Sequence, residues 1–289
     1  METKSTSNQT SAQITAYNSK TQYAELNGRK LAYRSIGKGP AIILVNRFRG
    51  TLDTWDPLFL DNLAQNFRVI TFDYTGIGHS SGTLPTDLSF VAQDIKDLAT
   101  HLNLSKITVM GWSYGGLVSQ ITAIKFPKLV EKLILIGTGP LGKREVPLEP
   151  LFLETAIKPE YDLNDEIILF FEPLSESSKK EAQASHDRIA QRIDRSKVPS
   201  AADVLQRYVQ GAEAAHEDKA GMLEELKATT IPILVVSGDH DISFAIENWF
   251  PLLRILTTAQ FIIFPLTGHA PQHQFPGLVA NYINSFLKE

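Results

Sequence analysis

Cysteine is absent from this chain of 289 residues. Its absence excludes disulfide bridges, thiolate metal sites and a cysteine nucleophile. An excess of positive charge is also missing, because 28 Lys and Arg residues stand against 32 Asp and Glu residues. The basic residues are scattered along the sequence, and the net charge is −4. We therefore expect no nucleic acid among the partners of this protein.

Long apolar runs are missing as well. No uninterrupted apolar segment approaches the roughly 18 to 20 residues that a membrane-spanning helix requires, so no membrane association is expected. The segment from Met1 to Gln13 is rich in Ser, Thr, Asn and Gln and lacks the hydrophobic centre of a signal peptide. These features predict a flexible tail over residues 1–20 and a cytoplasmic location.

Short apolar runs, in contrast, recur through the chain and alternate with helical patterns. Ala41 to Val45 is apolar at every position, as expected for a strand covered on both faces. Between Leu88 and Leu102, apolar residues recur at every third or fourth position, which is typical of one helical face. Such alternation predicts an α/β fold with a mostly parallel central sheet and helices on both faces.

The remaining elements are expected at the following places. Strands are predicted at Arg68–Phe72, Lys106–Met110, Leu133–Ile136, Ile231–Val236 and Phe261–Phe264, after an antiparallel hairpin that turns at Asn27-Gly28. Helices are predicted at Trp55–Ala64, from Ser113 to Phe126, at Ser243–Leu256 and at Pro276–Leu287, the last with Val279, Tyr282, Ile283 and Phe286 facing the core.

Between residues 141 and 230 the strand pattern stops. Only helical patterns occur there, at Leu148–Ile157, Asn164–Phe171, Ser177–Ile193 and Ala201–Ala214. An insertion at the carboxyl ends of parallel strands would cover the edge of the sheet where ligands usually bind. We therefore predict a helical cap at 141–230, inserted before the last two strands of a core formed by residues 21–140 and 231–289.

The most informative motif is Gly111-Trp112-Ser113-Tyr114-Gly115. It follows a strand pattern and precedes a helical pattern. In that context Gly-X-Ser-X-Gly indicates a nucleophile elbow, a turn so tight that small residues must flank the serine. Ser113 is thus the candidate nucleophile. The backbone amide of Tyr114, the next residue, is a candidate donor to an oxyanion.

A serine nucleophile needs a histidine to take its proton and a carboxylate to orient that histidine. Two loops that follow predicted strands supply such groups, namely Ser237 to Asp241 and the segment containing Gly268-His269. Within them Asp239 and Asp241 are alternative acids, and His269, His240 and His273 are alternative bases. The other histidines lie in predicted helices or in a glycine-rich turn, where surface or core roles are expected: His79, His101, His186 and His216.

These motifs, in the order serine, acid, histidine, resemble the α/β-hydrolase superfamily in its lid-bearing form, over residues 21–288. In that family the acid usually stands three residues after the glycine that closes its strand, and the base usually follows a glycine. The resemblance therefore implies a triad of Ser113, Asp241 and His269. It also implies that Asp73 to Ser80 forms a structural turn.

The resemblance further implies that the second oxyanion donor is the amide of Phe48. The loop that carries it departs from the family pattern, because Asn46-Arg47 stands where His-Gly is common. Arginine cannot adopt every backbone conformation that glycine can, so the departure is expected to affect the conformation of the oxyanion loop.

Taken with the family resemblance, the motifs imply a cofactor-independent serine hydrolase that cleaves an ester or related acyl bond of a small, fairly apolar substrate through an acyl-enzyme. Carbon–carbon bond hydrolysis or perhydrolysis by the same triad is an alternative, as is a ligand-binding or signalling protein that turns over slowly. No metal site is expected, since the histidines and carboxylates lack helix-spaced ligand patterns. Candidates for an apolar substrate pocket are Trp112, Leu141, Phe152, Phe170 and Phe171.

Overall fold

A computed structural model of the chain describes residues 14–26 and 28–289. Eight strands form one sheet in the order β1-β2-β4-β3-β5-β6-β7-β8. The β1–β2 and β2–β4 pairs are antiparallel and all other pairs are parallel, which confirms the predicted sheet. Asn27 of the predicted hairpin turn lies outside the described residues, as does the predicted tail over 1–13. The strands are β1 (Gln22–Leu26), β2 (Arg29–Ile36), β3 (Ala41–Val45), β4 (Arg68–Phe72), β5 (Ile107–Trp112), β6 (Val130–Ile136), β7 (Ile233–Gly238) and β8 (Ala259–Phe264).

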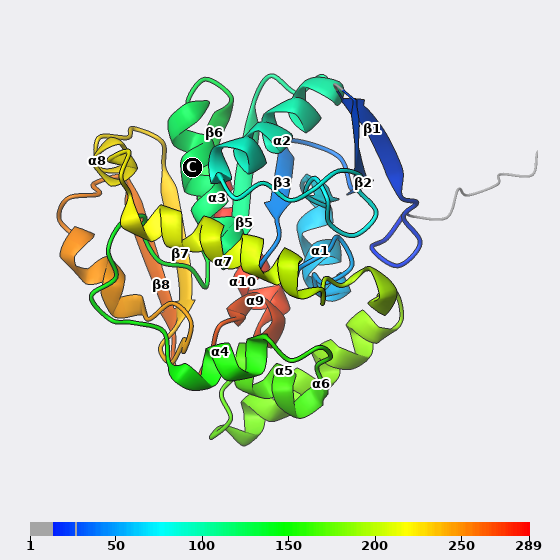
Figure 1. The fold of residues 1–289 in the computed structure, drawn as a ribbon, viewed down its shortest axis with the longest axis vertical. Coiled ribbons are helices and arrows are strands. Elements are labelled where there is room, and N and C mark those ends of the chain that lie inside the picture. The colour runs from blue at the N-terminus through cyan, green and yellow to red at the C-terminus, as the bar shows by residue number, and fades with distance from the viewer. Residues whose placement is uncertain (1–13, 27) are drawn as a thin grey trace, which may run out of the picture.

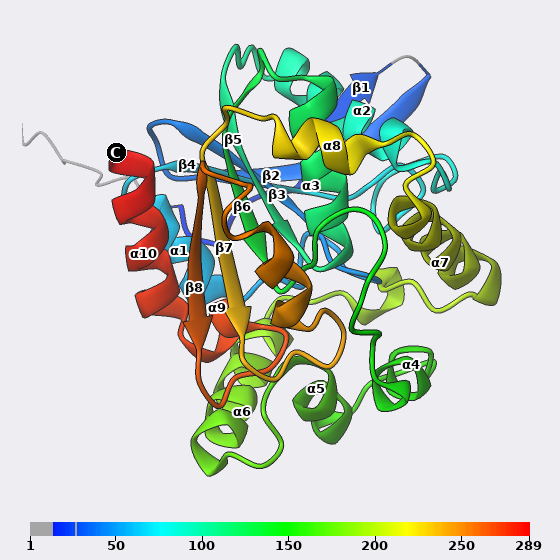
Figure 2. The same ribbon diagram turned by 90° about the vertical axis from the view of Figure 1, so that its left-hand side faces the viewer.

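Helices cover both faces of this sheet (Figure 1 and Figure 2). The side chains of β3 show why both faces of the sheet are covered. Ile43 and Val45 belong to the core cluster on one face, and Ile42 and Leu44 belong to the cluster on the other. This two-residue alternation is that of a strand buried on both faces. One face carries α2 (Leu88–His101), α3 (Tyr114–Lys125) and α8 (Met222–Lys227), and the other carries α1 (Pro57–Ala64) and α10 (Pro276–Lys288).

The helices inserted between β6 and β7 lie mainly beyond the carboxyl ends of the parallel strands, as Figure 2 shows for α4, α5 and α6. Of the inserted helices, α7 packs against α3, and so does α8, which therefore belongs to the layer on the sheet. The inserted elements are α4 (Pro150–Ala156), α5 (Leu163–Phe170), α6 (Glu176–Ala190), the 3-10 helix η1 (Arg195–Lys197), α7 (Ala202–Glu217) and α8. Among the helices that the structure describes, none is both long and apolar enough to cross a membrane.

Two elements of the last third of the chain differ from the prediction. The helix expected at Ser243–Leu256 is the shorter 3-10 helix η2 (Ile246–Leu252), which contains Pro251, a residue without an amide hydrogen to donate. Tyr282 was expected to face the core, but it is 42% exposed, and its ring packs edge-on against Phe264. The other expected core residues of α10 are buried, and a short helix, α9 (Pro271–Gln274), precedes it.

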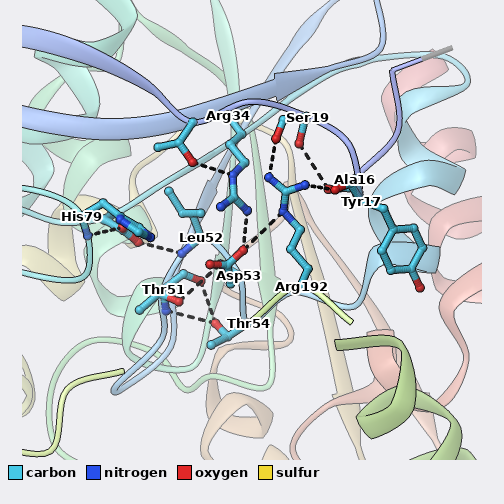
Figure 3. A network of polar contacts seen from close by, with 12 residues as sticks. Ala16, Tyr17, Ser19, Arg34, Thr51, Leu52, Asp53, Thr54, His79 and Arg192 are labelled. Atoms are coloured by element: carbon cyan, nitrogen blue, oxygen red, sulfur yellow. Dashed lines mark hydrogen bonds and ion pairs between the residues drawn. The ribbon is translucent and has the colours of Figure 1, made fainter. Parts of the chain in front are cut away.

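Residues 14–20 were predicted to belong to a flexible tail, but they pack against the folded chain. Ala16 is buried, and its amide donates to Asp61 Oδ1 at 2.7 Å. Arg192, which follows α6, donates to the carbonyl oxygens of Tyr17 and Ser19 (Figure 3). Its Nε atom also lies 3.5 Å from an Asp53 carboxylate oxygen, and Asp53 pairs in turn with Arg34 of β2. These long-range contacts left no signal in the local composition of the segment.

Candidate active site

Ser113 lies between the last residue of β5 and the first residue of α3. Its φ of 59° and ψ of −124° are rare for a residue that carries a Cβ atom. The Ser113 amide donates to the Ile136 carbonyl at 3.0 Å, and the Ser113 carbonyl accepts from the Gly116 amide at 2.7 Å. A Cβ atom at Gly115 would overlap the carbonyl oxygen of Val45. The strained turn therefore depends on glycine beside the serine, as the motif requires.

Asp241 and His269 follow β7 and β8, and their side chains meet at the same edge of the sheet. Asp241 Oδ2 lies 2.7 Å from His269 Nδ1, and the two side chains are 0% and 1% exposed. Asp241 Oδ1 accepts from the amides of Ser243 and Phe244 at 2.9 and 2.8 Å, which fixes the carboxylate. Because Nδ1 faces the carboxylate, Nε2 is the ring nitrogen left for another partner.

Two cavities meet at Ser113. The smaller one, with about 220 Å³ of space between atoms when its open mouth is included, is lined by both Ser113 and His269, which brings the candidate nucleophile and base to one space. The larger one, of about 780 Å³ including its open mouth, is lined by Ser113 and Tyr114 and is mostly apolar. Phe48, Phe152 and Ala156 line both cavities. Apolar walls with a few polar groups are usual for small-molecule sites.

The predicted pocket residues divide into two groups. Phe152 and Phe170 line the smaller cavity, and the Phe170 ring lies nearly parallel to the His269 ring, with centroids 6.4 Å apart. Trp112, Leu141 and Phe171 were predicted to line the pocket, but the described residues that form the two cavities do not include them.

The physical reasons for these corrections lie in the packing of the three side chains. Trp112 ends β5 with its side chain in the core beneath the site, where its indole N–H donates to the His269 carbonyl at 2.9 Å. Leu141 is buried in the core cluster that includes α3. Phe171 is buried in the opposite cluster, and its backbone contacts the loop at Gly268.

The alternative bases, His240 and His273, and the alternative acid, Asp239, have other hydrogen-bond partners. His240 is half-exposed and bonds through Nδ1 to Glu172 at 2.5 Å, a hydrogen bond that raises its pKa. His273 is buried against the Trp112 ring, and its Nε2 accepts from the Asp56 amide at 3.3 Å. Asp239 accepts from the Thr267 amide at 3.1 Å and thereby fixes the turn before His269.

Phe48 and Tyr114 line the larger cavity together with Ser113, and the oxyanion role of their amides stays a prediction. Tyr114 is the first residue of α3, so its amide has no acceptor within the helix. In the Phe48 loop the positive φ, 58°, occurs at Arg49 and not at Arg47. The Asn46 side chain is held in place, because it donates to the Phe72 carbonyl at 2.6 Å and accepts from Trp55 Nε1 at 2.7 Å. Asn46-Arg47 is thus accommodated without a glycine conformation at position 47.

The turn after β4 is hydrogen-bonded to the segment that continues from this loop. Asp73 accepts from the Leu52 amide at 2.7 Å and from the His79 amide at 2.8 Å. A Cβ atom on Gly78 would overlap the Asp73 carboxylate, so the glycine is needed for the turn. Burial raises the pKa of Asp73 to about 7. The segment Asp73 to Ser80 thus takes the structural role that was expected.

Several polar side chains of the site escaped prediction. Arg47 lines the smaller cavity, and Arg144, Glu213 and His216 line the larger one. Burial lowers the pKa of His216 to about 4. All but Arg47 come from the inserted segment, whose packing no local pattern encodes. Within the described residues, no group of three or more His, Asp or Glu side chains is arranged to hold a metal ion.

Comparison with known proteins gives a consistent set of matches. A model of the family described as alpha/beta hydrolase fold matches residues 40–276. An uncharacterized protein of Mycobacterium tuberculosis is 25% identical over 285 residues, which cover 92% of this chain and 80% of that protein. The putative carbamate hydrolase RutD of Agrobacterium fabrum is 33% identical over 106 residues, 36% of this chain and 40% of that protein. The solved structure of an alpha/beta hydrolase fold protein from Chitinophaga pinensis is 27% identical, with a TM-score of 0.84, and the match covers 96% of this chain and 100% of that one.

Proposed function

The chain belongs to the alpha/beta hydrolase fold family, and from this premise we propose that it is a cofactor-independent serine hydrolase. Its reaction would be the cleavage of an ester or related acyl bond in a small, fairly apolar substrate. One observation carries the proposal. His269, which is joined at 2.7 Å to the buried Asp241, lines the same cavity as the strained Ser113.

In the proposed reaction Ser113 Oγ attacks the carbonyl carbon while His269 Nε2 takes the hydroxyl proton. Asp241 holds the His269 ring through Nδ1–H and stabilises the imidazolium that forms. The amides of Phe48 and Tyr114 donate to the oxyanion, and losing one such donor typically lowers the rate roughly a hundred- to a thousandfold. His269 then protonates the leaving group, and a water molecule activated by His269 hydrolyses the acyl-enzyme.

The two cavities support a substrate with groups on both sides of the scissile bond. Ser113 borders both, so the acyl group and the leaving group would extend from the serine in different directions. Phe152 and Phe244 lie with their ring centroids 5.9 Å from that of His269, which keeps bulk water from the imidazole. Aromatic walls of this kind favour an apolar substrate.

The oxyanion loop favours turnover over the alternative of a slow ligand-binding protein. That alternative arose from the unusual pair Asn46-Arg47. The Asn46 side chain hydrogen-bonds to the Phe72 carbonyl and to the Trp55 indole N–H, and the residue with a positive φ is Arg49. These contacts support a loop that presents the Phe48 amide as in an active hydrolase.

A fluorophosphonate probe tests the proposal, because it labels only a serine activated by its surroundings. We expect labelling of the wild type at Ser113, hydrolysis of 4-nitrophenyl butyrate, and loss of both in Ser113→Ala. A folded wild type that resists the probe would contradict the proposal. Labelling without ester turnover would direct the search to carbon–carbon bond or perhydrolase chemistry by the same triad.

A further inference from the structure

Arg47 occupies an unusual place for a charged residue. It is only 9% exposed and lines the smaller cavity together with Ser113 and His269. Its guanidinium carbon lies 4.6 Å from the ring centroid of Phe170 and 5.3 Å from that of Trp112. The cation is therefore held between aromatic side chains at the wall of the cavity.

The hydrogen-bonding capacity of this guanidinium is mostly unused. Nη1 donates to the Phe48 carbonyl at 2.7 Å, whereas Nε is buried without an acceptor. In the described part of the chain, no carboxylate lies within ion-pair distance of Arg47. Glu166, which acts on Arg47 through space, is paired with His186 at 2.8 Å. Arg49, the other cation nearby, only adds repulsion.

A buried cation without a counter-ion is unfavourable unless another group compensates it. Burial lowers the pKa of Arg47 to about 10, which still leaves the side chain charged at neutral pH. The other residues of the smaller cavity supply no negative charge, since they are the neutral or apolar Phe48, Phe152, Ala156, Tyr161, Leu169 and Phe170 beside Ser113 and His269. Among the described residues none supplies an anion to Arg47, which leaves a ligand in the cavity as the partner that fits.

We propose that the otherwise apolar substrate carries one carboxylate close to its scissile acyl bond and that the Arg47 guanidinium binds this group. The inference rests on the proposed hydrolase function, since it places the anion in the cavity shared by the nucleophile and the base. Arginine suits this role because its planar fork of donors matches a carboxylate. The aromatic rings hold the fork in position without competing for its N–H groups.

Matched ester pairs test the proposal. One pair differs on the acyl side, with 4-nitrophenyl pentanoate against the mono-4-nitrophenyl ester of glutarate. The other differs on the leaving-group side, with 4-methylphenyl acetate against 4-acetoxybenzoate. The kcat/KM of each ester is measured for the wild type, for Arg47→Met and for Arg144→Met, which removes a cation from the larger cavity instead. Fluorophosphonate labelling of Ser113 and a thermal melt check that each variant keeps its fold and nucleophile.

We expect the wild type to prefer the carboxylate ester in at least one pair. In Arg47→Met the kcat/KM for that ester falls roughly a hundredfold, while that of its neutral partner changes less than roughly tenfold. Equal rates for both members of both pairs in the wild type would overturn the proposal. So would an equal loss for neutral and anionic esters in Arg47→Met, or a preference that depends on Arg144.

A binding measurement separates this inference from the hydrolase function. Calorimetry with Ser113→Ala and 4-acetoxybenzoate, with and without Arg47→Met, needs no turnover. If the wild type neither labels nor hydrolyses esters, binding to Ser113→Ala that is lost on adding Arg47→Met would leave the carboxylate site standing and reject the hydrolase. Labelling and turnover without carboxylate preference would reject the site alone.

Discussion

The guanidinium of Arg49 lies over the ring of Tyr161, with its Cζ atom 4.5 Å from the ring centroid. It also donates to the carbonyl oxygens of Ala156, Lys158 and Pro159 at 3.1, 2.5 and 2.7 Å, and to that of Pro199 at 2.6 Å. Arg49 thus joins the loop of the Phe48 amide to the inserted helices. Its positive φ of 58° is the conformational strain that this connection maintains.

Replacing this side chain should loosen the insertion over the site. In Arg49→Met the four carbonyl oxygens lose a charged donor, so we expect the free energy of unfolding to fall by about 2 to 4 kcal/mol. Ester hydrolysis should fall as well, because the Phe48 amide is no longer fixed. Urea unfolding and limited proteolysis of residues 150–199 measure the two effects. Arg254→Met, at an exposed position, is the control and should change stability by less than about 0.5 kcal/mol.

The sheet and the elbow were predictable because their signals are local. Ile42 to Val45 alternate between the two faces through the two-residue period of a strand, and Ser113 stands in a turn that only flanking glycines permit. Asp241 and His269 were assigned through the family resemblance, since the sequence alone left Asp239, His240 and His273 as alternatives.

The pocket was less predictable because its walls come from segments far apart in the chain. Trp112 stands next to Ser113 in sequence, yet the strand turns its side chain into the core below the site. Arg47 reaches the cavity wall only because α5 brings Phe170 beside it. Nothing in the local spacing of Arg47 distinguishes it from a surface arginine.

Mutation of the two aspartates after β7 should have very different effects on kcat. In Asp241→Asn an amide nitrogen can face His269 Nδ1 and hold the ring in the wrong tautomer, so we expect kcat to fall about a thousandfold or more. Asp239→Asn is the matched control, because its carboxylate bonds the Thr267 amide and does not contact His269. Its kcat should stay within about tenfold of the wild type. Equal losses in both variants would contradict the assignment of Asp241.

Gly115 should be intolerant of even one added methyl group. An alanine Cβ there would overlap the Val45 carbonyl and come within 2.6 Å of the Asn46 carbonyl, both of which are backbone atoms that cannot move aside. We expect Gly115→Ala to lower the free energy of unfolding by about 3 kcal/mol or more. Gly277→Ala, in α10, is the contrasting control. A Cβ atom there would lie 3.9 Å from the nearest atom, Asn62 Nδ2, which is an ordinary van der Waals contact. Its helical position predicts a gain of about 0.5 kcal/mol, and a comparable loss in both variants would contradict the steric argument.

His273 should make the protein less stable in mild acid. Burial lowers its pKa to about 4, below the 6.5 of an exposed histidine. Between these values the unfolded chain binds the extra proton, so the contribution of His273 to stability is complete above about pH 6.5 and is lost as the pH drops toward 4. In His273→Gln the slope of unfolding free energy against pH should decrease by roughly one proton in this window, whereas His216, shifted in the same direction, still contributes. Urea unfolding from pH 7 to pH 4.5 measures the slope, and an unchanged slope would show that the imidazole titrates normally.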